Sequence, residues 1–251
     1  MELNLSIKSL KTYFKVFENT GTIFRKEIRS YFNSTIAYIV ITVFFILMGW
    51  FYASTIFLVN LATLRDMFES AGIIFLFVVP AITMRLFAEE KKSGTIELLL
   101  TKPLKDWEIV VGKFLAAWAF VAVAILLTLI YYITISILGE VDHGAVIGGY
   151  IGLLLMTGVY TALGILASSL TENQIVAFIL SLFLCVVLFF IDKTLIILPE
   201  FLAGVLQFIS VHYHFSNIAR GVLDTRDLIY FLSIIGFSLY ITEYSLEKRK
   251  W

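Results

Sequence analysis

Long apolar runs separated by short polar links dominate this chain. Four stretches contain no Asp, Glu, Lys or Arg: Tyr31–Leu64, Phe114–Gly139, His143–Thr171 and Asn173–Ile191. A helix needs about 20 apolar residues to cross the hydrocarbon core of a bilayer. Within that core only helices or closed barrels satisfy every backbone hydrogen bond. The pattern therefore predicts an all-α, polytopic membrane protein.

We expect six membrane-spanning helices, none with a charged residue at its centre. They cover roughly Ile36–Val59, Ala71–Ala88, Phe114–Leu138, Val146–Ala167, Gln174–Ile191 and Leu228–Tyr244. The second span contains Pro80, which removes one backbone hydrogen bond and kinks a helix. Residues 34–246 would form the transmembrane domain, and residues 247–251 a basic tail.

The segment before the first span, residues 1–33, is polar and basic. Its apolar residues recur at i, i+4, i+7 and i+8, on one face of a helix: Phe24, Ile28, Tyr31 and Phe32. Arg25, Lys26 and Arg29 lie off that stripe. Such a pattern is typical of an amphipathic helix in the membrane interface. A helix packed on another protein surface is the alternative.

Residues 89–113, between the second and third spans, form the most charged internal segment. Glu89 and Glu90 continue the second span, and Ser93-Gly94 breaks it. Thr95–Thr101 then offers one or two helical turns, which Pro103 ends. A short helix parallel to the membrane could take a push from a cytoplasmic partner. A solvated loop is the alternative, and periodicity alone does not separate the two.

Two further helix starts carry capping signals. Thr171-Glu172-Asn173-Gln174 matches the capping box and marks the beginning of the fifth span. Asp106 is expected to cap the helix that leads into the third span, with Glu108 favourable at its positive end.

Residues 192–226 are too polar for an ordinary span. Phe201–Ala219 has no formal charge but holds six polar side chains: Gln207, Ser210, His212, His214, Ser216 and Asn217. We expect short helices that dip into the membrane from one side under a cover of protein or water. Interfacial hydrogen bonding is the expected role of the two histidines. On an extended stretch they could instead share a face and bind a metal.

The distribution of basic residues sets the orientation, because Lys and Arg favour the cytoplasmic side. With six spans and a cytoplasmic N-terminus, 15 of the 19 Lys and Arg residues are cytoplasmic. The four on the outside are Arg65, Lys193, Arg220 and Arg226. A seventh span at Phe201–Ala219 would move the basic C-terminal tail outside. We therefore expect a multi-pass protein of the inner membrane with both termini in the cytoplasm.

Composition agrees with this class and narrows the chemistry. The chain has 251 residues, 60% hydrophobic and 15% charged, with zero net charge and a mean hydropathy of +0.93. Soluble domains have about 25% charged residues. The single cysteine, Cys185, lies in an apolar run, so neither a disulfide framework nor a thiol metal site is expected. The N-terminus lacks the pattern of a removable signal peptide.

Several functions lack the residues they need. The only Gly-Lys pair, Gly112-Lys113, does not fit the phosphate-binding loop G-x-x-x-x-G-K-[ST]. The uncharged span centres argue against a proton- or sodium-driven carrier, which uses intramembrane charges. An intramembrane hydrolase would need a nucleophile with a base at helical spacing, and Ser168 and Ser169 have neither His nor Lys near them in sequence. No nucleic-acid partner is expected.

Gly148 and Gly152 form a G-x-x-x-G pattern in the fourth span, with Gly149 beside it. Small residues let membrane helices approach closely. Packing within the chain is the expected role, and a contact between two copies is the alternative.

Three blocks of residues resemble the type-2 ABC transporter permeases, and in particular their gliding-motility-associated branch, which is related to permeases serving copper-enzyme maturation. The first block is residues 89–104 (EEKKSGTIELLLTKPL), followed by Trp107-Glu108 and Gly112-Lys113. The second is residues 168–178 (SSLTENQIVAF). The third comprises residues 214–217 (HFSN), 220–224 (RGVLD) and 226–231 (RDLIYF).

The resemblance implies six membrane helices per permease, two permeases per transporter and two separate ATPase subunits, which would bind the ATP and Mg²⁺. It implies that the short helix after the second span is a coupling helix that contacts the ATPase: Glu89, Glu90, Ser93, Gly94, Thr95, Glu97, Leu98, Lys102 and Pro103. The helix with Arg25, Lys26 and Arg29 would be the connecting helix. Re-entrant outer helices would close the pathway with Pro199, Glu200, His212 and His214.

These observations predict the membrane permease subunit of an ATP-driven exporter, without catalytic residues, cofactor or metal of its own. The second permease would be another copy or a paralogue. The rival is a membrane scaffold that anchors a surface or secretion assembly and moves no cargo.

Overall fold

The computed structural model describes residues 18–59, 63–101, 104–193 and 200–248. Lys102, Pro103 and Pro199, which the sequence nominates as functional, lie outside these residues, as do residues 249–251 of the basic tail.

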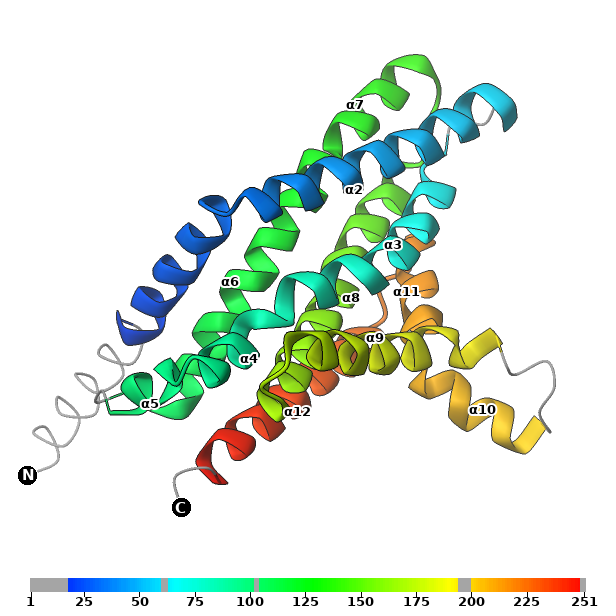
Figure 1. The fold of residues 1–251 in the computed structure, drawn as a ribbon. Helices are drawn as coiled ribbons and strands as arrows, with labels where there is room; N and C mark the ends of the chain where they lie inside the picture. The colour runs from blue at the N-terminus through cyan, green and yellow to red at the C-terminus, as the bar shows by residue number, and fades with distance from the viewer. Residues whose placement is uncertain (1–17, 60–62, 102–103, 194–199, 249–251) are drawn as a thin grey trace, which may run out of the picture.

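The described residues form helices joined by short links, with no strand among them (Figure 1). Six of the helical segments are long and apolar enough to cross a membrane. They are Ala37–Phe57, Arg65–Lys92, Asp106–Leu138, His143–Leu170, Gln174–Lys193 and Thr225–Glu247. The predicted all-α fold with six spans is confirmed.

The first three spans are each built from two consecutive segments. The first runs as α2 (Thr35–Ser54) and a π-helical turn, η1 (Thr55–Val59). The second is α3 (Arg65–Thr83) followed by α4 (Arg85–Lys92), and the third is α6 (Asp106–Leu127) followed by α7 (Leu129–Leu138). The break between α3 and α4 lies at Met84, whose N still donates to the Pro80 carbonyl oxygen at 2.9 Å. The hydrogen bond that Pro80 itself lacks belongs to the preceding turn, so Pro80 does not account for this break.

The last three spans are the single helices α8 (His143–Leu170), α9 (Gln174–Phe190) and α12 (Thr225–Glu247). Each begins after an Asx cap whose side chain accepts backbone N–H bonds, namely Asp142, Asn173 and Asp224. All six spans have the positions that the apolar runs predict.

Two of the predicted caps are wrong. Asn173, not Thr171, caps α9, because its Oδ1 accepts from Ile175 N at 2.9 Å. The Thr171 hydroxyl accepts from Asn173 N instead, in the link after α8. Lys105, not Asp106, precedes the first turn of α6, and Glu108 Oε2 accepts from its backbone N at 3.2 Å. Helix α9 begins at Gln174, as predicted, and α6 begins at Asp106 itself, so the capping residues are wrong but the spans are correct.

The central helix is α8. In its most apolar window 83% of the residues are buried within the chain, against 17% for the first span and 22% for the sixth. Glycines make this packing possible: a methyl group at Gly149 would lie 2.2 Å from the Phe68 ring, and one at Gly164 would lie 2.0 Å from Thr83 Oγ1. The helices around α8 therefore touch its backbone.

The G-x-x-x-G pattern serves packing inside the chain. A methyl group at Gly148 would lie 2.2 Å from the Ile218 carbonyl oxygen, and one at Gly152 would lie 3.0 Å from the Phe215 ring. Both partners belong to α11 (Val211–Ala219), one of two short helices between the fifth and sixth spans. The other is α10 (Glu200–Ile209). Two short helices, not a seventh span, thus occupy this part of the chain.

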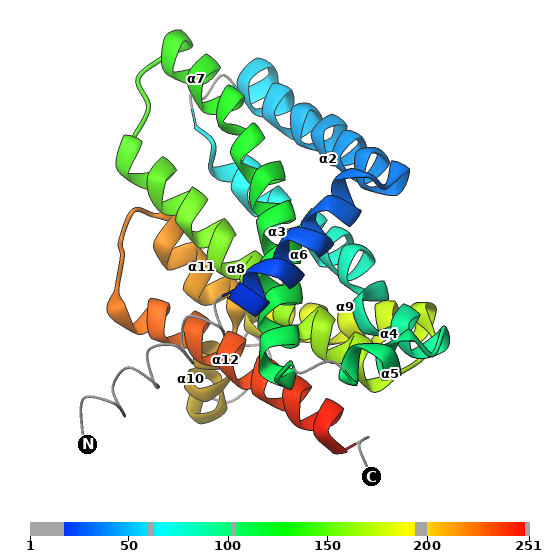
Figure 2. The same ribbon diagram turned by 90° about the vertical axis from the view of Figure 1, so that its left-hand side faces the viewer.

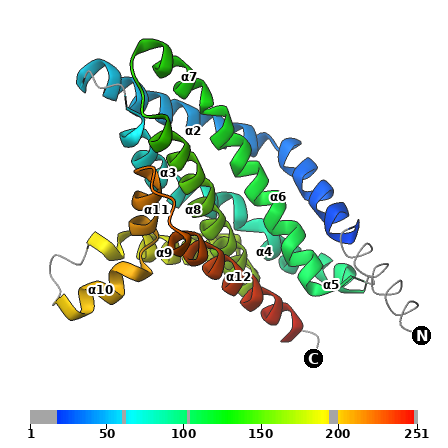
Figure 3. The same ribbon diagram turned by 180° about the vertical axis from the view of Figure 1, so that it is seen from behind.

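The arrangement brings distant parts of the sequence together at one end of the bundle. The first residues of the helix 18–32, the short helix α5 (Thr95–Leu100) and the end of α12 lie at this end, here named the α5 end, while α7 lies at the opposite one (Figures 1 and 3). Figure 2 shows the helix 18–32 lying across α6.

The outer surface of the bundle is apolar. Large exposed side chains on three different spans include Trp50 (71% exposed), Phe183 (62%) and Phe237 (66%). Apolar surface on this scale is not left in water by soluble monomers. It suits a hydrocarbon environment, in which α8 is shielded and the other spans face lipid.

Replacing Gly148 by alanine tests the close contact of α8 with α11. The added methyl group must displace a backbone carbonyl, so we expect Gly148→Ala to lower the free energy of unfolding by about 1–3 kcal/mol. The measurement is the midpoint of thermal unfolding in detergent.

Gly236→Ala in α12 is the matched control, because no atom lies within 4 Å of the new methyl group. Alanine is the better helix former, so the midpoint of this variant should stay the same or rise. Equal midpoints for the two variants would contradict the close contact.

Candidate functional site

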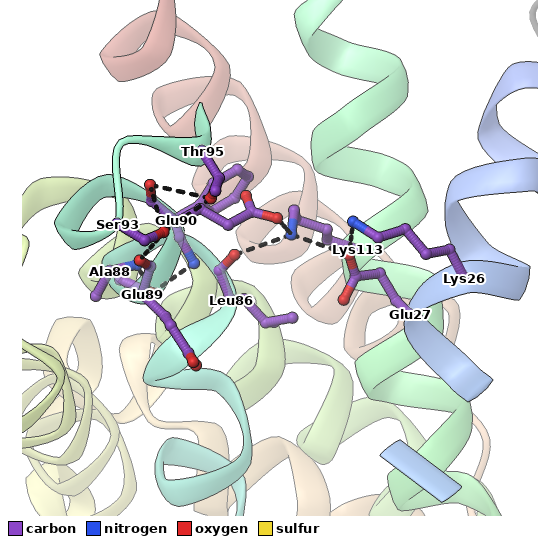
Figure 4. A network of polar contacts seen from close by, with 11 residues as sticks. Lys26, Glu27, Leu86, Ala88, Glu89, Glu90, Ser93, Thr95 and Lys113 are labelled. Carbon is purple, nitrogen blue, oxygen red and sulfur yellow. Dashed lines mark hydrogen bonds and ion pairs between the residues drawn. The ribbon is translucent and has the colours of Figure 1, made fainter. Parts of the chain in front are cut away.

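The candidate site lies at the α5 end, where α4, α5, α6 and the helix 18–32 meet (Figure 4). Ser93 ends α4, and Gly94 follows with a φ of 70°. This left-handed conformation suits glycine at the position after a helix C-cap. The chain can therefore reverse direction within two residues and begin α5 at Thr95. The short helix has the place and the length that the sequence predicts.

Lys113 of α6 is the centre of an ion-pair network. Its Nζ lies 2.8 Å from Glu90 Oε1, 3.2 Å from Glu27 Oε1 and 2.9 Å from the Leu86 carbonyl oxygen. These three acceptors match the three N–H donors of an ammonium group. Its Nζ also lies 5.2 Å from the centroid of the Phe87 ring. We name Lys113, Glu27, Glu90 and the Leu86 carbonyl the Lys113 network.

Burial makes this network a strong constraint. The Lys113 side chain is 2% exposed, and those of Glu27 and Glu90 are 12% and 18% exposed. A lysine is almost never this deeply buried without a partner. Removing one member of such a group leaves an uncompensated charge away from water. The network therefore holds the helix 18–32, α4 and α6 in one relative position.

Two further contacts fix the helix 18–32. Asn19 Nδ2 donates to Glu108 Oε2 of α6 at 3.0 Å. Tyr31 stacks on Phe120 with ring centroids 5.1 Å apart, and its hydroxyl is 3.4 Å from the Ile82 carbonyl oxygen. Burial raises the pKa of the Tyr31 phenol far above its usual range, so the group remains a donor at physiological pH.

The predicted apolar stripe of this helix is partly correct. Tyr31 is buried and Ile28 packs against the core, whereas Phe32 is 37% exposed. The most buried residue near the start of the helix is Ile23, which the stripe misses and which packs on Gly112 of α6. Arg25, Lys26 and Arg29 are exposed. Much of the helix's apolar face is therefore covered by its own chain.

A polar cavity of about 330 Å³ lies between the helix 18–32 and α4. It is lined by charged and hydroxyl side chains together with the Lys113 network, among them Lys26, Ser30, Arg85, Glu89, Ser93 and Thr95. One predicted connecting-helix residue, Lys26, thus faces the same cavity as the predicted coupling residues Glu89, Glu90, Ser93 and Thr95.

The predicted coupling residues divide into an outer and an inner set. Glu89, Thr95 and Glu97 are exposed, so they are available to a partner. Ser93 is also exposed, and its hydroxyl donates to the Glu89 carbonyl at 2.9 Å. Glu90 instead turns inward to Lys113. The side chain of Leu98 lies outside the described part of the chain.

Ser168 connects the start of α4 to α8. Its Oγ accepts from the backbone N of Phe87 and of Ala88, both at 3.0 Å, and donates to the Met84 carbonyl at 2.8 Å. Lys91 Nζ donates to the Ser169 carbonyl one turn further along α4.

Sequence reasoning misses Glu27 and does not assign a role to Lys113 or Ser168. A signal for Lys113 exists: it is a basic residue directly before a charge-free run, and ionisable residues at membrane depth are usually paired. Nothing in the pattern identifies Glu27 as its partner, since the two residues are far apart in sequence.

The two histidines of α11 are held by separate carboxylates. His212 Nδ1 lies 2.8 Å from Asp192 Oδ2, just after α9. His214 Nδ1 lies 2.6 Å from Asp227 Oδ1 of α12, and its Nε2 lies 2.9 Å from the Phe208 carbonyl oxygen. Because α11 is helical, the histidines do not share the extended face that a metal site between them requires. They tie α11 to its neighbours.

Of the other two residues predicted for a re-entrant gate, only Glu200 is described, as the first residue of α10. Its side chain and the whole of Pro199 lie outside the described residues. Within those residues, no group of three or more His, Cys, Asp or Glu side chains is arranged to hold a metal ion.

Comparison with known proteins identifies the family. A family model described as "ABC-2 family transporter protein" matches residues 21–221, which is most of the chain. The chain belongs to this family. The search of curated proteins found no match.

Membership of the ABC-2 family confirms the broader part of the resemblance. This chain is a membrane permease subunit of an ABC transporter, and proteins of this family generally work with an ABC ATPase. The matched residues include the Lys113 network, α5 and Ser168, and end before α12. The candidate site is therefore part of the family domain.

Replacing Lys113 by methionine tests the Lys113 network. Methionine keeps much of the length but leaves Glu90 without its cation and Glu27 with the exposed Lys26, 3.6 Å away. We therefore expect the free energy of unfolding to fall by about 3–5 kcal/mol. Thermal unfolding in detergent measures the effect. The control is Lys92→Met at the exposed end of α4, where a surface change should cost within about 0.5 kcal/mol. Similar losses in both variants would show that Lys113 has no special role.

Proposed function

We propose that this protein is the permease subunit of an ATP-driven exporter and forms half of the translocation pathway. A separate ATPase subunit would bind and hydrolyse ATP with Mg²⁺, and a second copy or a paralogue would complete the pathway. The observation that carries the proposal is α5: a short helix whose Thr95 and Glu97 are exposed and whose Ile96 is buried. A turn at Gly94 joins it to α4, which the Lys113 network holds in place.

In this proposal α5 is the coupling helix, and Thr95 and Glu97 contact the ATPase. Glu97 is an exposed acidic residue on a helix of six residues, so it can pair with a basic groove on the ATPase. Closure of the ATPase dimer on ATP would push α5 and change the tilt of the spans behind it. The uncharged centres of the spans support an external energy source, since they offer no relay of intramembrane charges.

We further propose that the α5 end faces the cytoplasm of a cell whose inner membrane holds the protein. The helix 18–32, α4, α5 and the end of α12 lie at this end. Basic residues lie on the helix 18–32 (Arg25, Lys26 and Arg29) and on α4 (Arg85, Lys91 and Lys92), and Lys248 follows α12. Basic residues favour the cytoplasmic side. The likeness of residues 89–104 and 168–178 to the gliding-motility-associated branch supports placement among those permeases.

Reversing the charge at Glu97 tests the coupling role. If Glu97 meets a complementary surface of the ATPase, Glu97→Lys should reduce the permease-dependent ATPase activity by roughly 5-fold or more, because coupling between sites is typically about 1–3 kcal/mol. Assembly, measured by co-purification of the two subunits, should persist. Glu140→Lys, at the exposed opposite end of the bundle, is the control and should behave as wild type. Unchanged activity in Glu97→Lys would remove the coupling assignment.

Labelling of single cysteines tests the orientation. In a Cys185→Ala background, Ser93→Cys places a thiol at the exposed turn before α5, and Glu140→Cys places one at the opposite end. A membrane-impermeant maleimide added to intact cells should label position 140 but not position 93. In inverted membrane vesicles the maleimide should label position 93 but not position 140. Labelling of position 93 from the exterior of intact cells would refute the orientation and the contact with a cytoplasmic ATPase.

A further inference from the structure

The second span is interrupted where the candidate coupling region joins the bundle. Helix α3 ends at Thr83, Met84 lies between, and α4 begins at Arg85. A break in a helix is a natural hinge, because fewer backbone hydrogen bonds hold the two parts in line. Left free, such a hinge would let α4 and α5 swing without moving the spans.

Three side chains from three different elements bond to the backbone around this break. The Tyr31 hydroxyl lies 3.4 Å from the Ile82 carbonyl oxygen, and Lys113 Nζ lies 2.9 Å from that of Leu86. Ser168 of α8 makes the most contacts, since its Oγ bonds to Met84, Phe87 and Ala88 at 2.8–3.0 Å. It therefore bonds both to the residue at the break and to the first turn of α4.

The Ser168 hydroxyl replaces hydrogen bonds that an unbroken helix would make with its own backbone. Its oxygen accepts from two N–H groups in the first turn of α4, which is the usual work of an N-cap side chain. Here the side chain comes from another helix. Because Ser168 is fully buried, no water competes for these groups, and leaving them unpaired is costly.

A second contact lies further along α4. Lys91, itself buried, donates from Nζ to the Ser169 carbonyl oxygen. Helix α4 is thus attached to the C-terminal part of α8 near its start and again near its end. Two attachment points on one short helix prevent it from rotating about either of them.

From this geometry we propose that Ser168 is a positioning residue that makes α4 and α5 move with α8 as one body. The inference rests on the proposed function, in which α5 receives the push of the ATPase. The push then reaches α8, the most buried span, and is not lost by bending at Met84. The neighbouring helices, which contact α8 through its glycines, follow.

Distance measurements between spin labels test this arrangement in the assembled transporter. In the Cys185→Ala background, Ser93→Cys and His143→Cys place labels at the turn before α5 and at the exposed first residue of α8. Labelled chains are diluted with unlabelled chains, so that only distances within one chain are recorded. The complex is measured without nucleotide and with ATP trapped.

With Ser168 in place, we expect a narrow distance distribution whose mean is the same in both states. Ser168→Ala should broaden the distribution and make its mean shift on ATP trapping. Ser168→Thr, which keeps a hydroxyl, should restore the narrow distribution. Ser169→Ala is the matched control: this neighbouring serine is equally buried, but among the described residues its hydroxyl bonds only to the Leu166 carbonyl of its own helix. It should behave as wild type.

Three results would overturn the proposal: a wild-type mean that shifts with nucleotide, a narrow and unshifted distribution in Ser168→Ala, or equal broadening in Ser169→Ala. If Ser168→Ala does not assemble, Ser168→Cys is used instead, because a thiol has a similar volume to a hydroxyl but forms weaker hydrogen bonds. A chain with Ser168→Cys and neither Ser93→Cys nor His143→Cys then shows whether the spin label reacts with position 168. Failure of the permease to bind an ATPase would refute the proposed function. The widths of the distance distributions measured without nucleotide would still test the Ser168 contact.

Discussion

The close approach of helix backbones to α8 is the constraint on which the rest of the structure depends. In a bilayer, water does not drive helices together, so packing and hydrogen bonding must do so. At Gly148, Gly149 and Gly164 the neighbouring atoms occupy the space that a side chain would need. The positions of α3 and α11 follow from these contacts. The outer spans can then present large apolar side chains to lipid.

Polar chemistry is concentrated at the ends of this apolar framework. At the α5 end, Lys113 binds two carboxylates and one carbonyl oxygen. Ser168 accepts hydrogen bonds from two backbone N–H groups next to the break in the second span. Between α9, α11 and α12, two histidine–carboxylate contacts bind the short helices to the spans. In each place a buried polar group has partners from a different element, so the contacts fix the relative position of helices as well as their stability.

The sequence predicts the spans well because each is a long apolar run with a physical length requirement. The turn at Ser93-Gly94 is also predicted, whereas the residue pattern alone leaves a short helix and a solvated loop open after it, and the resemblance to the permease family favours the helix. The caps at Thr171 and Asp106 are predicted wrongly, because several adjacent residues can cap and the local pattern does not choose among them. The partners of Lys113, His212 and His214 could not be predicted, because they depend on how the helices are packed in space.

The third span has a consequence for the surrounding membrane. Asp106–Leu138 contains 33 residues, and its charge-free part, Phe114–Leu138, is about 37 Å long at 1.5 Å per residue. A hydrocarbon core is about 30 Å thick, so this part must lean away from the bilayer normal or thicken the lipid around it. The Lys113 network keeps the angle between α6 and the helix 18–32 fixed. A thinner bilayer must therefore tilt these helices together or thicken around them.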